Sequence, residues 1–193
     1  MSNEQQAAHA HNGVDVDALL AARVAITDAP QAGQFTWKAR STWVDGTHTR
    51  IEMDNFFGLG ETQGRSRTHV VEADHPEQFS APDNAATPVE IVLAALAGCL
   101  GGGVAAVAQR RDIQLRSVTA TVEGDMDMAG VLGIDADVRN GFSDIRITFE
   151  IDADASEDEI AALVAQSQKR SAVFDIITNP TNVHATVTKV GGR

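Results

Sequence analysis

The segment from Thr87 to Arg111 restricts the fold more than any other, because residues 91–108 are all apolar or glycine. Thr87, Pro88 and Glu90 suit the N-cap, the first position and the third position of a helix, so we predict a helix that begins at residue 88. A run of about 18 apolar residues reaches the lower limit for a membrane span. Much of this run is alanine and glycine, however, and alternating strand patterns flank it in the sequence. We therefore predict the buried central helix of an α+β domain rather than a membrane segment.

Charge and composition exclude several classes of partner. The 193 residues are 43% hydrophobic and 22% charged, as in an ordinary soluble globular protein. The net charge of −12 repels nucleic acid phosphates and anionic membrane surfaces, so we expect neither as a partner. A single cysteine excludes an internal disulfide and a cysteine-based zinc site. The N-terminus has neither the basic region nor the apolar stretch of a signal peptide, so we expect a cytoplasmic location.

The remaining sequence predicts one domain with an N-terminal extension. Residues 1–13 are polar and expected to be disordered, and residues 14–32 form a helix (Val14 to Ile26) and a linker. Residues 33–193 form the main domain, in which Ser156 and Glu159 supply the capping box of a second helix. Strands are predicted at residues 65–73, 113–123, 144–152 and 182–190, where apolar residues alternate.

An N-terminal hairpin is predicted by alternation in residues 35–43 and by the Asp45-Gly46 pair that follows. A two-residue loop would place Ile51 and Met53 on the polar face of the first strand. We therefore prefer a three-residue loop, Val44 to Gly46, which pairs Ile51 with Ala39. This register sets Arg40 opposite Arg50, a like-charge pair that is destabilising unless an anion lies nearby.

Four glycines interrupt the central helix, at Gly98 and at residues 101–103. They would let another backbone approach closely, at a cost in helix propensity. We expect a contact with another helix here, within the chain or across a dimer.

Cys99 lies in the middle of the same helix, and two interpretations stay open. Most free cysteines are small buried hydrophobes. A reactive thiol would need a lowered pKa, and the helix N-terminus is about three turns away, too far to supply it. A cation from another segment would be required, and Arg50 and Arg40 are the best candidates. Glu90 falls on the opposite side of the helix from Cys99 and is expected to act as a cap.

The pattern P-x-E-x-x-L-A-A-L-A-G-C, from Pro88 to Cys99, resembles the central helix of the OsmC/Ohr family (osmotically inducible protein C and organic hydroperoxide resistance protein). The similarity continues through Ile113 to Gly124, Gly141 to Ile151 and SAVFDIITNPTNV from Ser171 to Val183, with looser agreement upstream. The resemblance implies an intertwined α+β homodimer in which antiparallel strands wrap long central helices.

The resemblance also implies a set of site residues. Family members with peroxidase activity reduce organic hydroperoxides with two cysteines, an arginine that helps ionise the first, and a glutamate that holds the arginine. The first cysteine matches Cys99, and the arginine matches Arg50, with Arg40 as second choice. Ser171 takes the place of the second cysteine, and Val89 takes the place of the glutamate.

These departures leave two functions in competition. Serine cannot form the resolving disulfide, so a peroxidase of this kind would be a one-cysteine enzyme that needs an external thiol reductant. The alternative is a non-catalytic homodimer that binds an apolar ligand in the family pocket. Neither function calls for a cofactor. His69 and His75 share a face of an extended segment, but we interpret them as surface residues rather than metal ligands.

Overall fold

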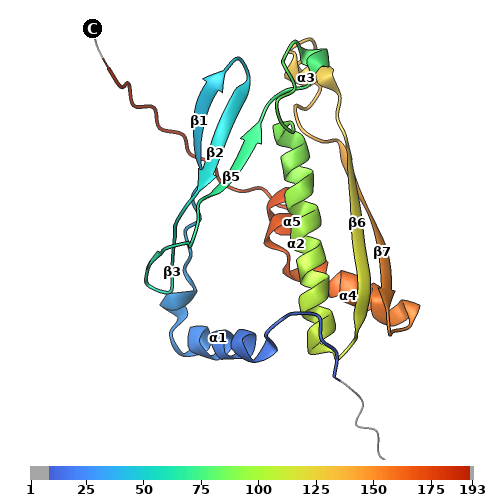
Figure 1. The fold of residues 1–193 in the computed structure, drawn as a ribbon. Helices are drawn as coiled ribbons and strands as arrows, with labels where there is room; N and C mark the ends of the chain where they lie inside the picture. Colours follow the sequence, from blue (N-terminus) through green and yellow to red (C-terminus); the bar gives the residue numbers. More distant parts are fainter. Residues whose placement is uncertain (1–8, 192–193) are drawn as a thin grey trace, which may run out of the picture.

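Helix α2 (Pro88–Arg110) forms the centre of the fold in the computed structural model, which describes residues 9–191 (Figure 1). Thr87 and Glu90 form the predicted capping box, in which the Glu90 carboxylate accepts the Thr87 N–H at 2.9 Å. By length and hydropathy alone α2 could cross a membrane, but in this fold it packs against strands and helices. Its buried residues are Leu96, Leu100, Val104, Val107 and Ala108.

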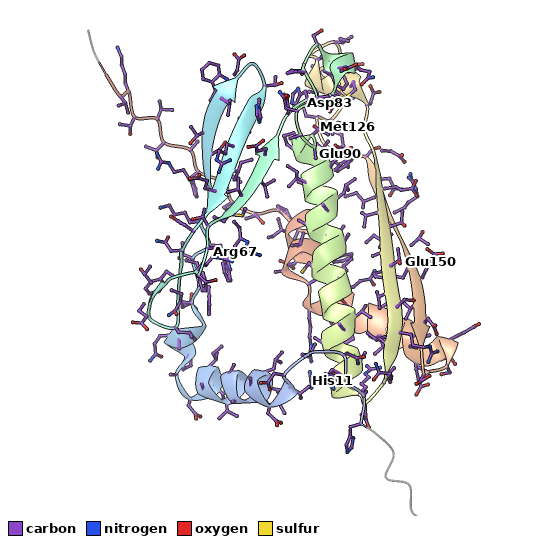
Figure 2. All side chains as sticks on the ribbon, viewed as in Figure 1. His11, Arg67, Asp83, Glu90, Met126 and Glu150 are labelled. Atoms are coloured by element: carbon purple, nitrogen blue, oxygen red, sulfur yellow. The ribbon has the colours of Figure 1, made fainter. Side chains whose placement is uncertain are left out.

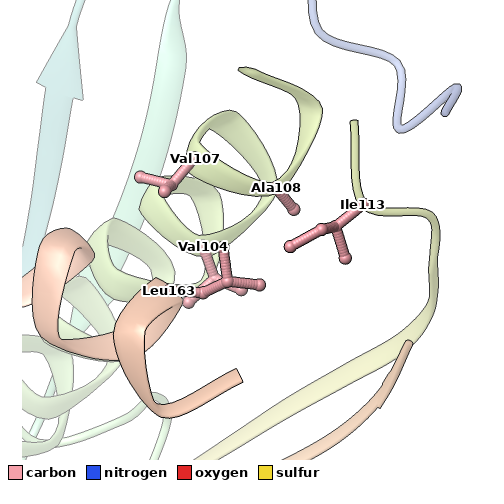
Figure 3. Packing of buried hydrophobic residues seen from close by; sticks show 5 residues of the cluster. All are labelled: Val104, Val107, Ala108, Ile113 and Leu163. Atoms are coloured by element: carbon pink, nitrogen blue, oxygen red, sulfur yellow. The ribbon is translucent and has the colours of Figure 1, made fainter. Parts of the chain in front are cut away.

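The C-terminal half of the chain covers one side of α2. Strands β6 (Leu115–Asp125) and β7 (Asp144–Ala153) form an antiparallel pair, with the short helix α3 (Met128–Val131) in their connection. Helices α4 (Glu157–Arg170) and α5 (Ala172–Thr178) follow. Figure 3 shows the core that these elements share, which consists of Val104, Val107, Ala108, Ile113 and Leu163. The strands predicted at residues 113–123 and 144–152 are thus confirmed within two residues at each end, and a helix follows Ser156 as predicted.

The N-terminal half builds a second sheet on the other side of α2 (Figure 1). Its antiparallel strands lie in the order β1 (Arg40–Asp45), β2 (His48–Met53) and β5 (His69–Ala73). Strands β3 (Phe56–Gly58) and β4 (Glu61–Gln63) form a separate short hairpin. Short 3₁₀ turns occupy Pro30–Gly33 and Glu77–Phe79. The chain is therefore an α+β fold of antiparallel sheets around a long apolar helix, as predicted.

The predicted register of the first hairpin is wrong by two residues. Ile51 pairs with Ser41, not Ala39, and Arg40 pairs with Glu52. An irregularity between Trp43 and Asp45 absorbs one residue, so that Asp45 pairs with His48 across a tight turn in which Gly46 has a positive φ of 51°. A shift of two residues keeps every side chain on its predicted face. It removes the like-charge pair of Arg40 and Arg50.

The N-terminal extension is more ordered than predicted. Residues 1–8 of the expected disordered tail lie outside the described residues, but residues 9–12 bind the turn between α2 and β6. Figure 2 shows His11 at this end of α2, where its N–H donates to Gln114 at 2.8 Å. The Ala10 N–H likewise donates to Asp112 at 2.6 Å. Helix α1 (Val16–Asp28) then begins and ends two residues later than predicted, with Asp15 as its N-cap.

The predicted strand at residues 182–190 does not form within the chain. The segment extends away from the molecule past the β1–β2 hairpin (Figure 1), and Val183, Val187 and Val190 are 87%, 94% and 91% exposed. Alternating valines form a strand only where a sheet edge accepts them. Within the described residues this segment pairs with no strand.

Candidate functional site

The thiol of Cys99 lies half-buried where α2 meets the junction of α4 and α5. The Ser171 hydroxyl donates a hydrogen bond to the Cys99 sulfur, with an Oγ–Sγ distance of 3.0 Å. Ser171 is only 6% exposed and is the N-cap of α5, where its Oγ accepts the Phe174 N–H at 3.1 Å. Because this oxygen accepts from the backbone, its single proton is free to point at the sulfur.

A close helix contact fixes the geometry of this junction. Ser167, buried on α4, donates its hydroxyl to the Leu100 carbonyl at 2.7 Å. A Cβ on Gly103 would lie 2.2 Å from the Ser167 oxygen, so only glycine allows α4 to approach this closely. One predicted glycine contact is therefore present within the chain. Side chains at Gly98, Gly101 and Gly102 would meet nothing within 4 Å.

Cys99 opens into a cavity of about 180 Å³ between α2, α4 and α1. Leu19, Ala106 and Val107 give it apolar walls, and Ser167 and Ser171 contribute hydroxyls. Arg110 and Arg170 line the same cavity. These two arginines were not among the predicted site residues, although Arg110 follows Cys99 by eleven residues, which is three helical turns and returns to the same face.

Arg50, the predicted partner of the thiol, lies on the other sheet. On β2 its guanidinium binds Glu52 at 3.3 Å and Glu72 at 3.2 Å. It does not line the Cys99 cavity. Arg40 faces Glu52 across the hairpin instead. The chain therefore brings Cys99 and Ser171 together but does not bring either predicted arginine to the thiol.

A larger cavity of about 540 Å³ lies near the start of α2, at the end of the molecule where Figure 2 labels Glu90 and Met126. Val89, the residue at the family glutamate position, lines it. The other walls are mostly apolar and include Phe79, Met126, Met128, Val131 and Leu132. Glu90 itself is exposed and acts as the helix cap, as predicted.

A buried carboxylate, Asp74, organises the loop that leads to this cavity. It accepts hydrogen bonds from the Thr47 hydroxyl at 2.6 Å, from the His75 N–H at 2.8 Å, and from both nitrogens of Asn84. These donors, the Thr47 hydroxyl first, lower the pKa of Asp74 to about 2. Asp74 ties β5 to the β1–β2 turn and so holds the chain that enters α2.

No group of three or more histidine, cysteine, aspartate or glutamate side chains within residues 9–191 gathers closely enough to hold a metal ion. His69 is exposed on β5 and pairs with Met53, whereas His75 lines the larger cavity.

The comparison with known families decides the membership of this chain. The profile described as OsmC-like protein matches residues 81–186, more than half of the sequence. The chain belongs to the OsmC-like protein family. The match includes α2, Cys99 and Ser171, so the resemblance noted at the central helix is confirmed.

Solved structures agree with this family fold. An OsmC-like protein from Mycoplasma pneumoniae is 15% identical with a TM-score of 0.57, covering 75% of this chain and 89% of its own. A Legionella pneumophila protein described as organic hydroperoxide resistance protein OsmC is 20% identical with a TM-score of 0.50, covering 74% and 88%. An OsmC-like protein of unknown function from Vibrio cholerae is 11% identical, with a TM-score of 0.52 and coverage of 72% and 91%. Curated protein sequences give no match.

Proposed function

We propose that this OsmC-like protein is a one-cysteine thiol peroxidase of the cytoplasm, which reduces small organic hydroperoxides in a stress response. The observation that carries the proposal is the 3.0 Å contact between the Cys99 sulfur and the Ser171 hydroxyl. A family cysteine pair would occupy these two positions. Here a hydroxyl stands in place of the second thiol, within contact distance of the first.

The proposed reaction has two stages. The Cys99 thiolate attacks the outer oxygen of the hydroperoxide, an S–O bond forms, the O–O bond breaks, and the alkoxide takes a proton to leave as the alcohol. Cys99 is then a sulfenic acid. One thiol of an external dithiol attacks the Cys99 sulfur and displaces water, and the second thiol releases Cys99 by forming the dithiol's own disulfide. Two electrons pass from the dithiol to the hydroperoxide.

The hydroxyl of Ser171 supports the first stage. A hydroxyl that donates to a thiolate stabilises the charged form, and this lowers the energy of the nucleophile without offering a second sulfur. Since Ser171 cannot resolve the sulfenic acid, the external thiol must reach Cys99 itself. The half-burial of Cys99 and its open cavity agree with this requirement.

We propose that a second copy of the chain supplies Arg50 to complete the site. Within one protomer Arg50 binds Glu52 and Glu72, which lie in its own sheet. The outward face of α2 remains open at three glycines, and Val92 is 42% exposed. Large apolar side chains are also exposed elsewhere, at Trp37, Trp43 and the valines of residues 182–190. A homodimer would bury these surfaces together.

The test is consumption of an alkyl hydroperoxide, such as tert-butyl hydroperoxide, with a dithiol reductant. We expect turnover in the wild type, none in Cys99→Ser, and a steep fall in Arg50→Ala. Arg146→Gln is the matched control, because it also removes one cation but lies on β7 bound to Asp125 and Asp144. Equal rates with and without the protein would reject the peroxidase.

The apolar cavity of about 540 Å³ beside Val89 favours a second function. Under this alternative the protein is a dimer that binds an apolar ligand without turnover. The size of the cavity falls in the range of small-molecule sites, about 300–1,000 Å³. Under this alternative an uncharged hydrophobic fluorophore binds the wild type, and Val89→Glu, which places a charge in the apolar wall, abolishes binding. If hydroperoxide is not consumed and this binding is found, the alternative replaces the peroxidase.

A further inference from the structure

Three arginines gather beside the Cys99 cavity at the C-terminal ends of α2 and α4. Arg110 and Arg170 line the cavity of Cys99. They also line an adjoining cavity of about 130 Å³, together with Arg111 and Gln166. Cys99, Arg110 and Arg170 therefore line one cavity, and the second cavity adjoins it at four shared residues, namely Arg110, Arg170, Val107 and Gln166.

The spacing along α2 explains why one cavity reaches both groups. Cys99, Gly103, Ala106 and Arg110 follow one another by four, three and four residues, which keeps them on a single face. The eleven residues from Cys99 to Arg110 span about 16 Å of helix axis. Because the Cα–Cβ bonds of a helix tilt toward its N-terminus, the Arg110 side chain leaves the backbone in the direction of Cys99. Between them this face carries only Gly103, against which Ser167 packs, and the small side chain of Ala106.

The charge of these arginines is not neutralised locally. None of the three forms an ion pair within residues 9–191, whereas Arg50, Arg116 and Arg146 each bind two carboxylates. Arg111 contributes to lowering the pKa of Glu159, but the larger cause is the N–H of Ser156, which that carboxylate accepts as a helix cap. In a chain of net charge −12, such a concentration of uncompensated cations is a local attraction for anions.

Helix electrostatics accounts for part of this arrangement. Arg110 and Arg170 lie in the last turns of α2 and α4, where cations interact favourably with the helix dipole. That role requires neither a common cavity nor an open path to a thiol. The interaction of these arginines with the helix dipoles affects only the stability of the fold, so it can be measured separately from ligand binding.

We propose that Arg110 and Arg170, with Arg111 behind them, form a subsite for the carboxylate of a ligand whose other end reaches Cys99. The apolar walls of Leu19, Ala106 and Val107 would hold the hydrocarbon between the two ends. The carboxylate belongs either to the hydroperoxide or to the thiol reductant. This inference deepens the proposed function, since it names the charge class of a molecule that Cys99 meets.

The first test needs no turnover. Iodoacetate and iodoacetamide alkylate the same sulfur and differ chiefly in charge, so the ratio of their rates at Cys99 reports the local field. At low ionic strength we expect this ratio to fall about twofold for each arginine replaced, as for a unit charge roughly 10 Å away in water. The Arg110→Gln/Arg170→Gln double variant should therefore lose about fourfold, and the effect should weaken in 1 M salt.

Arg146→Gln is again the control for loss of one positive charge, and its ratio should equal that of the wild type. A purely structural role of Arg110 and Arg170 would lower the unfolding temperature of the double variant and leave its ratio unchanged. That outcome overturns the subsite, provided that circular dichroism shows the variant folded at the assay temperature. It would not touch the peroxidase proposal, which the tert-butyl hydroperoxide assay tests with a neutral substrate.

The second test identifies the source of the carboxylate. KM is compared between wild type and Arg170→Gln for a carboxylate-bearing alkyl hydroperoxide and its methyl ester, and for dihydrolipoate and the neutral dithiothreitol. A KM that rises several-fold only for the anionic hydroperoxide assigns the site to the substrate, and one that rises only for dihydrolipoate assigns it to the reductant. Equal changes for charged and neutral partners in both comparisons would contradict the inference.

Discussion

The hydroxyl of Ser171 lies 3.0 Å from the sulfur of Cys99, although 72 residues separate them in the chain. Helix α4 ends and helix α5 begins at Ser171, so the backbone on both sides of this residue is fixed. A cysteine at this position would place a second sulfur beside the first. With serine at this position, the chain places an oxygen beside the Cys99 sulfur.

Replacement of Ser171 by cysteine should therefore create a disulfide with Cys99. The Oγ–Sγ distance exceeds an S–S bond of about 2.05 Å by an amount that small side-chain rotations can close. After one equivalent of hydroperoxide, mass spectrometry should find Ser171→Cys two hydrogens lighter, with both thiols blocked to alkylation. Ser156→Cys, at the start of α4, is the matched control and should form no disulfide, with a sulfenic acid at Cys99 and a free thiol at residue 156. If Cys99 is oxidised in Ser171→Cys and no disulfide forms, the Cys99–Ser171 geometry is wrong.

Acid should destabilise the protein partly through Asp74. Its pKa is lowered to about 2 in the folded state from an ordinary value of 3.8, chiefly by the Thr47 hydroxyl. A lowered pKa contributes stability that is fully present above the unfolded value and is lost as the pH falls from about 4 toward 2. Urea unfolding between pH 2 and 7 should show a smaller loss in Asp74→Asn than in the wild type, and a lower midpoint at pH 7. Asp83→Asn, an exposed neighbour, should leave the profile unchanged.

Gly103→Ala should be more destabilising than Gly101→Ala, although both residues lie in the same helix. Alanine improves helix propensity by about 1 kcal/mol at either position. At Gly103 the new Cβ would collide with Ser167, and such overpacking typically costs about 1–3 kcal/mol. At Gly101 nothing lies within 4 Å. Chemical denaturation measures the difference, and two variants of equal stability would contradict the close approach of α2 and α4.

If the proposed homodimer is obligate, the unfolding temperature should rise with protein concentration, because dissociation accompanies unfolding. A tenfold dilution series in calorimetry measures this dependence, and sedimentation at micromolar concentration gives the mass directly. Deletion of residues 182–193 should weaken the dimer if the exposed valines of this segment pair with a partner strand. A monodisperse monomer of 20.4 kDa would contradict the dimer.

Local signals allowed much of the fold to be predicted from the sequence. The start of α2 follows from its capping residues, and β7 follows from strict alternation, since both depend on neighbours in the chain. The hairpin register was missed because an irregularity between Trp43 and Asp45 costs one residue without leaving a glycine signal. The strand predicted at 182–190 does not form for a different reason: its pattern needs a free sheet edge, and within the described residues it pairs with none.

The candidate site could be predicted only in part. The central helix pattern pointed to Cys99, and the family comparison pointed to Ser171, which the fold brings to the thiol. Arg50 was chosen by position in a hairpin whose register was wrong, and it lies in another sheet. Arg110 could have been predicted from the sequence, since a spacing of eleven residues in a helix places it on the same face as Cys99. Arg170 could not, because its approach depends on how α4 crosses α2.

The most direct test of the proposed function is a single-turnover oxidation of Cys99. The reduced protein receives one equivalent of tert-butyl hydroperoxide and then dimedone, and intact mass and peptide mapping locate any adduct. We expect dimedone on Cys99 and no disulfide, because Ser171 cannot capture the sulfenic acid. We also expect recovery of the free thiol when a dithiol is added before dimedone. An unmodified Cys99 after millimolar hydroperoxide would contradict the proposed function.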